Sequence, residues 1–273
     1  MPRNLHDDTT LTPDREVPGR FHADLPEGWR VMYVFGGVSM YTALRAMHEA
    51  LGRDDLELVT ANAIFLAPVP PGPVQLDVAT LRDGRGASQM AADLRVPGAD
   101  GPALRVHGVF GRAHDIELAH QEVRFPDVPP PGAVAPPPPP DRPGPWGEIP
   151  FHAQTDWRPV TPFDDPGTGN FLCWVRMHEG ECDRLALTVH GDVLGPAVGR
   201  ALFRPDDPVH FMVLSLEIGI RFIAAPVTSW VLQEIEAWHI GDGYATGPAR
   251  LWDEAGNLCA IATQTAHLRL IRD

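Results

Sequence analysis

In the second half of the chain, an apolar helix is predicted to begin within the stretch Thr188-Val189-His190-Gly191-Asp192-Val193-Leu194-Gly195-Pro196-Ala197-Val198 and to end near Leu202. Aspartate is a preferred N-cap residue, because its carboxylate accepts the free amides of a helix's first turn, and that turn also tolerates proline. Asp192 therefore has two interpretations. It is an ordinary helix cap, or it is a functional carboxylate beside backbone N–H groups that could hold an oxyanion.

A similar helix is predicted in the first half of the chain. After Val34-Phe35-Gly36-Gly37, apolar residues at helical spacing predict a helix up to Leu51, which Gly52 ends. Each predicted helix follows one strand, at residues 20–25 or 170–177, and precedes four others. These are predicted at 58–66, 74–81, 87–96 and 103–109 in the first half, and at 210–222, 230–238, 244–252 and 258–270 in the second.

The turns between these strands recur as well. Ala67-Pro68 matches Ala225-Pro226, Asp83-Gly84 matches Asp242-Gly243, and Gly101 matches Gly256, at offsets of 158, 159 and 155 residues. Such offsets indicate a duplicated unit. One strand, one helix and four strands are the order of a hotdog unit. The sequence therefore predicts an α+β fold, a double hotdog of two tandem units, each an antiparallel sheet wrapped around a central helix.

Composition predicts the domain boundaries. Residues 1–18 are polar and are expected to be a flexible N-terminus. Residues 19–125 form the predicted N-terminal hotdog unit, and residues 151–273 form the C-terminal unit that carries the candidate site. Residues 126–150 are rich in proline, including the run from Pro136 to Pro140, and predict an extended linker outside both cores.

Charge and composition argue against several functions. The 273 residues include 36 acidic and 22 basic side chains, a formal charge of −14, which disfavours nucleic acid and membrane surfaces as partners. Every basic residue is arginine, which excludes lysine Schiff-base chemistry. The chain has no GxGxxG between a strand and a helix, no HExxH and no CxxC, so we predict neither a cofactor nor a metal site. A start without a signal-peptide core, and no apolar run of about 18 residues, predict a soluble, cytoplasmic protein.

Gln264 is a candidate site residue, because it lies among apolar residues on one face of the alternating strand 258–270. A buried amide without a hydrogen bond costs about 1–3 kcal/mol, so we expect a polar partner for it. Counting from Gly101 as from Gly256 gives Val109 as the equivalent position in the first half. The amide is therefore expected in the second unit only.

Two further residues are candidates. In strand 210–222, regular alternation places Ser215 on one face with Glu217, opposite Ile218, and this face is either solvated or functional. No GxSxG motif surrounds Ser215, which disfavours a triad nucleophile. His190 lies two residues before Asp192 and is an alternative base.

These segments give the chain a resemblance to the bacterial acyl-CoA thioesterase II (TesB-type) family, which folds as two hotdog units in one polypeptide. The resemblance runs from about Arg20 to Arg269. The segments that carry it are Val34-Phe35-Gly36-Gly37, Thr80-Leu81-Arg82-Asp83-Gly84, the strand from Ser215 to Pro226, and Ala262-Thr263-Gln264.

In that family an aspartate at the second helix start, a threonine on the following strand and a glutamine on the last strand activate a water. The resemblance therefore implies catalytic roles for Asp192, Ser215 and Gln264, with serine in place of the threonine. The family strand usually carries Asp-His where this chain has Glu217-Ile218. This departure bears on the substrate range and the activity.

The resemblance implies hydrolysis of acyl-CoA or related acyl thioesters in fatty acid metabolism, with no metal or redox cofactor. The first half has no carboxylate beside Phe35-Gly36-Gly37, so one active site per chain is expected. Two alternatives stay open: a non-catalytic acyl-CoA-binding hotdog protein, and a hotdog hydratase or dehydratase, which usually needs an Asp/His pair that is not found after Asp192. The sequence does not decide the acyl chain length, the carrier, or whether the chain forms a homo-oligomer.

Overall fold

A computed structural model describes residues 2–114, 119–137, 149–162, 168–203 and 211–271. Within these residues, thirteen strands form one sheet in which all neighbouring strands are antiparallel. The first unit supplies β1 (Thr12–Pro13), β2 (Arg20–Leu25), β3 (Glu57–Phe65), β4 (Gly72–Asp83), β5 (Ala87–Arg95) and β6 (Leu104–Gly111). The second supplies β7 (Thr155–Pro159), β8 (Asn170–Met177), β9 (Phe211–Phe222), β10 (Val231–Glu236), β11 (His239–Gly241), β12 (Tyr244–Asp253) and β13 (Leu258–Leu270).

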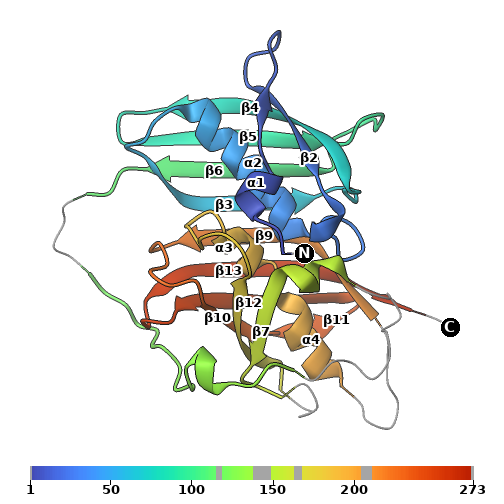
Figure 1. Ribbon diagram of the computed structural model, residues 1–273, viewed down its shortest axis with the longest axis vertical. Helices are drawn as coiled ribbons and strands as arrows, with labels where there is room; N and C mark the ends of the chain where they lie inside the picture. The colour runs from blue at the N-terminus through green and yellow to red at the C-terminus, as the bar shows by residue number, and fades with distance from the viewer. Residues whose placement is uncertain (1, 115–118, 138–148, 163–167, 204–210, 272–273) are drawn as a thin grey trace.

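The two units meet where β3 pairs with β9, which we call the seam. From the seam outward the first unit runs β3-β6-β5-β4-β2, and the second runs β9-β13-β12-β10-β8 in the corresponding order. The predicted double hotdog is therefore confirmed. Figure 1 shows the first unit above and the second below, with the helices on the same side of the sheet.

One long helix fills the first unit. In α2 (Gly36–Leu51), the side chains of Met40, Leu44 and Met47 are fully buried, and the helix packs against β4, β5 and β6. Gly52 ends the helix in the left-handed conformation (φ 61°), and its N–H donates to His48 O, as expected for a glycine after a helix.

The corresponding helical segment of the second unit is broken. The structure has α3 (Leu187–Gly191) and α4 (Leu194–Leu202), both packed against second-unit strands, with Asp192 in the break. Val193 is the residue at the N-cap position of α4, and no side chain caps that position. The sequence interpretation of Asp192 as the N-cap of this helix is therefore wrong.

The register of β9 and β13 contains a bulge beside this break. Gln264 pairs with Ile218 and Ala266 with Ser215, so β9 has one more residue than β13 between these pairs. Leu216 is 38% exposed, and Ser215 turns to the inner face that Ile218 also occupies. The regular alternation predicted for this strand fails here, because a bulge shifts the side-chain pattern by one residue.

The N-terminal segment is folded, in contrast to the flexible segment expected from its polarity. Asn4 caps α1 (Leu5–Asp8) by accepting a hydrogen bond from His6 N at 2.9 Å. The side chain of Leu5 is buried, and Trp29 Nε1 donates to Asp8 Oδ2 at 2.8 Å. An apolar anchor and an indole hydrogen bond therefore hold residues that composition alone assigns to a frayed end.

The first part of the linker and Phe125, the residue before it, also pack against the fold. The ring of Phe125 lies beside those of Trp174 and Trp252, with centroids 6.3 and 5.7 Å away, and Trp174 Nε1 donates to Pro129 O at 2.9 Å. A 3-10 turn, η2 (Pro131–Ala133), follows. This part covers apolar side chains of the second unit rather than lying outside both cores. Residues 138–148, which include most of the predicted proline run, lie outside the described residues.

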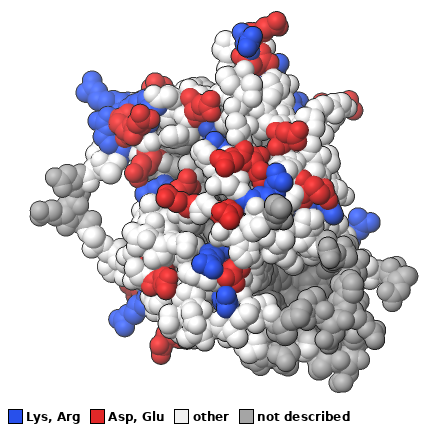
Figure 2. Space-filling model, in the orientation of Figure 1, with Lys and Arg blue, Asp and Glu red and all other residues white. Residues whose placement is uncertain are grey.

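The surface shown in Figure 2 carries acidic and arginine side chains interleaved over both units. Ion pairs among the described residues include those of Asp156 with Arg158 (2.9 Å) and with Arg176 (3.2 Å). In the part of the chain that the structure describes, no helix is both long enough and apolar enough to span a membrane.

Candidate active site

Asp192 is the centre of a buried hydrogen-bond network. Its Oδ1 accepts hydrogen bonds from Ser215 Oγ (2.7 Å) and Gln264 Nε2 (2.9 Å), and its Oδ2 accepts one from the backbone N–H of Gly37 (3.0 Å). The fold thus brings the three candidate residues from the sequence into contact. The third partner of Asp192, Gly37, belongs to the first turn of α2, so the carboxylate caps a helix of the other unit.

Gln264 has the polar partners that its place on an apolar face requires. Besides Asp192, its Nε2 donates to Ser215 Oγ at 2.7 Å, and its Oε1 accepts from Leu194 N at 3.0 Å. Leu194 is the first residue of α4, so the glutamine side chain satisfies the amide that Asp192 was expected to cap. Both amide hydrogens and the amide oxygen of Gln264 are in use.

The paired glycines at the start of α2 allow this close approach. A Cβ on Gly36 would lie 2.5 Å from Asp192 Oδ2 and 2.8 Å from the ring of Phe65. A Cβ on Gly37 would lie 2.7 Å from the backbone oxygen of Thr188 in α3. Since real side chains do not approach so closely, glycine is the residue that lets the two units meet here.

Burial raises the pKa of Asp192, while the hydrogen bonds from Ser215, Gly37 and Gln264 oppose this shift. The side chain is 7% exposed, so desolvation of the charged form dominates. A carboxyl group whose pKa moves toward neutral pH is better matched to accept and return a proton.

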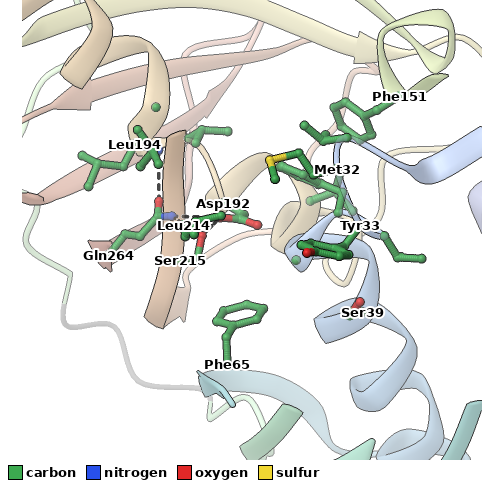
Figure 3. A pocket seen from close by; sticks show the side chains of 18 of the residues that line it. Met32, Tyr33, Ser39, Phe65, Phe151, Asp192, Leu194, Leu214, Ser215 and Gln264 are labelled. Atoms are coloured by element: carbon green, nitrogen blue, oxygen red, sulfur yellow. Dashed lines mark hydrogen bonds between the residues drawn. The ribbon is translucent and has the colours of Figure 1, made fainter. Parts of the chain in front are cut away.

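The network lies in the wall of a cavity of about 590 Å³. In Figure 3, Asp192, Ser215 and Gln264 lie together on one side of it, and Met32, Tyr33 and Phe151 on the other. Phe65 and Ser39 also line the cavity, which extends from the first turn of α2 to α4 and β9. Its lining is mainly apolar, with the carboxylate at the wall, as a site for an apolar chain with a reactive polar end requires.

His190, the alternative base, does not join this network. The residue is 2% exposed, burial lowers its pKa to about 4, and its Nε2 has no hydrogen-bond partner among the described residues. The ring is therefore neutral at neutral pH. Gln233 of β10, which the sequence analysis missed, donates from Nε2 to His190 O at 3.3 Å. The alternation of residues in strand 230–238 places Gln233 on the same face as Val231 and Ile235, and this signal was sufficient to find a second amide on an inner face.

The described residues contain no cluster of three or more histidine, cysteine or acidic side chains that could hold a metal ion. The polar side chains that line the cavity are instead one carboxylate, the guanidinium of Arg269, and hydroxyl, amide, imidazole and indole groups.

Family models match both halves of the chain. The acyl-CoA thioesterase N-terminal domain matches residues 25–111, and the acyl-CoA thioesterase C-terminal domain matches residues 130–268. The chain belongs to the acyl-CoA thioesterase family. No curated protein sequence matches it.

Solved structures share the fold of this family member along nearly its whole length. A conserved protein of unknown function with a hot dog fold from Alicyclobacillus acidocaldarius is 22% identical, with a TM-score of 0.84 and 98% of each chain covered. The acyl-CoA thioesterase II TesB2 from Mycobacterium marinum is 18% identical, with a TM-score of 0.76 and 98% of each chain covered. The tesB protein from Mycobacterium avium subs paratuberculosis is 17% identical, with a TM-score of 0.76, and covers 97% of this chain and 98% of its own.

Proposed function

We propose that the chain hydrolyses acyl-CoA thioesters in this cavity, with Asp192 as the general base that activates a water. The observation that carries the proposal is the buried carboxylate, held by a hydroxyl, an amide and a helix N–H at the wall of an apolar cavity. Membership in the acyl-CoA thioesterase family supports the same chemistry.

The hydrogen bonds of the network determine where the water can bind. A carboxylate offers about four lone-pair positions, and three of those of Asp192 are occupied, two on Oδ1 and one on Oδ2. The free position on Oδ2 can accept one water hydrogen, and the free lone pair of Ser215 Oγ the other. Gln264 has no donor left for the water, so it acts as a positioning residue for Asp192 and Ser215.

Two backbone amides are available for the carbonyl oxygen of the thioester. Gly36 and Gly195 lie at the starts of α2 and α4 and line the cavity, and their N–H groups have no acceptor within the described part of the chain. Helix N-termini favour negative charge, so either amide can stabilise the oxyanion of a tetrahedral intermediate.

The reaction then balances without another group. The water oxygen bonds to the thioester carbon as Asp192 Oδ2 takes a water proton. The C–S bond breaks when the tetrahedral intermediate collapses, and the departing thiolate takes the proton from Asp192. The products are a carboxylic acid and free CoA thiol, and the carboxylate is regenerated.

The test is thiol release from a panel of acyl-CoA esters by wild type and Asp192→Asn. Asparagine keeps one acceptor oxygen for Ser215 and Gln264 but cannot take a proton, so the rate should fall by about two to four orders of magnitude. A matched control is Asp183→Asn. Asp183 Oδ1 accepts from Ala186 N at 2.7 Å just before α3, and the residue does not line the cavity, so this variant should keep the wild-type rate.

Circular dichroism and the melting temperature accompany the rates, to show that each variant is folded. A folded Asp192→Asn protein with the wild-type rate would contradict the proposed base. A wild type that binds acyl-CoA without releasing thiol would favour the non-catalytic alternative. Loss of enoyl-CoA absorbance without thiol release would favour a hydratase.

A further inference from the structure

The helical segment of the second unit is interrupted at one hydrogen bond. In a continuous α-helix, the N–H of Leu194 would donate to the backbone oxygen of His190, four residues earlier. Here α3 ends at Gly191 and α4 begins at Leu194. Asp192 lies between them with φ −91° and ψ 66°, outside the helical range, and from there its carboxylate reaches the N–H of Gly37 at 3.0 Å. The position of the carboxylate therefore depends on the break staying open.

Side chains of two strands take the places of the missing helical partners. Gln264 Oε1 of β13 accepts from Leu194 N at 3.0 Å (Figure 3), and Gln233 Nε2 of β10 donates to His190 O at 3.3 Å. The two glutamines are 5% and 2% exposed. A buried amide, N–H or carbonyl group without a partner costs about 1–3 kcal/mol. Both ends of the interrupted hydrogen bond are thus satisfied by amides that the sheet supplies.

Buried amides of this kind accompany the broken helix and not the unbroken one. In the first unit, β4 and β6 occupy the places of β10 and β13 in the strand order, and α2, which continues from Gly36 to Leu51, packs against both. The buried side chains of these two strands are all apolar: Val74, Leu76, Leu104, Val106 and Phe110. A helix whose own hydrogen bonds are complete needs no amide from the sheet. The contrast links both glutamines to the break.

Gln233 and Gln264 differ in how they reach Asp192. Gln264 Nε2 donates directly to Asp192 Oδ1 at 2.9 Å. Gln233 contacts the backbone two residues earlier, so it acts through the peptide chain. Without its donor, the carbonyl of His190 would be buried and unpaired, and the group able to satisfy it is its helical partner, Leu194 N. Forming that bond takes Leu194 N from Gln264 and closes the break, which withdraws the carboxylate of Asp192 from the first turn of α2.

We propose that Gln233 is a positioning residue of the active site, which holds the break between α3 and α4 open through His190 O and thereby keeps Asp192 in the place where it accepts a proton. This inference rests on the proposed role of Asp192 as the base. It adds a fourth side chain to the site, one that does not contact the carboxylate and does not follow from the three residues that the family resemblance implies.

The first test needs no substrate. The N–H of Gly37 has no partner within its own helix, because it lies in the first turn, so its protection from hydrogen exchange comes from Asp192 Oδ2. Gln233→Met replaces the amide by an unbranched apolar side chain of similar length. Exchange at Gly37, followed by NMR, should become at least about tenfold faster, while that of Leu44 in the middle of α2 should stay the same.

Gln233→Asn repeats this test with a polar side chain that is one methylene shorter and cannot keep the contact with His190 O. It should give the same change at Gly37, so the result does not depend on how well methionine packs. Wild-type exchange at Gly37 in either variant, once circular dichroism shows that variant to be folded, would overturn the inference. It would do so whether or not the chain hydrolyses thioesters.

The second test asks whether Gln233 acts through Asp192. Displacing a catalytic group by about 1 Å costs up to about a hundredfold in rate, so Gln233→Met should lower kcat for thiol release by about ten- to a hundredfold. In the Asp192→Asn background the same substitution should change the residual rate by less than about twofold, because the base is already absent. An equal fall in both backgrounds would contradict a positioning role and leave Asp192 as the proposed base. A wild-type rate in Asp192→Asn alone would overturn the proposed function, and the positioning role with it.

Gln154→Met is the matched control. Gln154 is also a buried glutamine, 3% exposed, whose Nε2 donates to a backbone oxygen, that of Pro150, at 3.3 Å, and it does not line the cavity. The substitution removes the same kind of hydrogen bond elsewhere in the fold, so it should leave both the exchange at Gly37 and kcat at their wild-type values. If it altered them as much as Gln233→Met does, the effect of Gln233 would be general destabilisation, and the inference would be wrong.

Discussion

The two units have the same bulge, where β3 pairs with β6 and where β9 pairs with β13, but the side chains beside it are apolar in the first unit and polar in the second. In β3, as in β9, the pairing shifts by one residue, and the side chain at each bulge turns outward: Val59 is 44% exposed and Leu216 is 38% exposed. The residue immediately before the bulge is Leu58 in the first unit and Ser215 in the second. The bulge is thus part of the duplicated fold, and the site uses it.

The strand beside each bulge shows the same difference. Gly108 of β6 and Gln264 of β13 each pair two positions before the register shift of their own unit. The register therefore identifies Gly108 rather than Val109 as the position equivalent to Gln264. A Cβ on Gly108 would lie 3.1 Å from the sulfur of Met47 in α2. The unbroken helix therefore fills the first unit, whereas the break around Asp192 leaves room for polar side chains in the second. The same fold therefore has a packed apolar interior at this position in the first unit and the candidate site in the second.

The largest expected effect is the pH dependence of kcat/KM, which Asp192 of the second unit should produce and the first unit should not. Burial raises the pKa of Asp192 above the ordinary aspartate value of about 3.9, and only the carboxylate can accept a proton. Below the raised pKa, kcat/KM should fall about tenfold per pH unit, a hundredfold over two units. A pH–rate profile with an acid limb at the ordinary value would contradict this.

The same shift determines how stability depends on pH. Because the folded-state pKa is raised, the contribution of Asp192 to stability is fully present below its unfolded pKa and is lost as pH rises through the folded pKa. Urea unfolding across this range should show wild type losing stability relative to Asp192→Asn as pH rises. The apolar Leu58 and Gly108 of the first unit cannot contribute such a change. If the free energy of unfolding changed with pH in the same way in both proteins, the raised pKa of Asp192 would be excluded.

The next effect concerns the helix starts of the two units. Gly37 and Gly195 are each the second residue of a helix. A Cβ on Gly37 would meet backbone atoms of Thr188 and Val189 at 2.7 Å, whereas a Cβ on Gly195 has nothing within 4 Å. Gly37→Ala should therefore lower the free energy of unfolding by about 1–3 kcal/mol, and Gly195→Ala should leave it unchanged or raise it by about 0.5–1 kcal/mol. Urea titrations measure both free energies of unfolding. Equal effects would show that the backbone at Thr188 and Val189 moves to make room for a Cβ at Gly37.

The sequence predicted much of this comparison, because it depends on periodicity and on local turn chemistry. The repeated turns gave the two units, and Gly52 correctly ended α2. The polar amide of Gln264 within an apolar face correctly required buried partners. These inferences need only residues that are near one another in the chain or in a strand pattern.

The contacts that cross the seam were beyond such reasoning. The Asp192–Gly37 hydrogen bond joins residues 155 positions apart, and no local pattern distinguishes it from a cap of α4. A bulge adds a residue without a composition signal, so the inward turn of Ser215 could not be seen in the alternation of β9. The hydroxyl of Ser215 was assigned to the site by resemblance alone. Gln233 differs from both, because its contact with His190 lies within the second unit and the alternation of strand 230–238 was enough to identify it.

The smallest effect should come from exchanging the hydroxyl residue at the bulge. Ser215→Thr keeps the Oγ that donates to Asp192 Oδ1 and accepts from Gln264 Nε2, and threonine suits a strand. Ser215 is only partly buried, so we expect a change within about 0.5 kcal/mol in stability and a nearly unchanged rate of thiol release. Ser215→Ala is the control: it removes a donor from Asp192 and an acceptor from Gln264, and should cost about 1–3 kcal/mol in stability together with turnover. If threonine and alanine had the same effect, the hydroxyl would have no role, and the bulge would serve packing in both units.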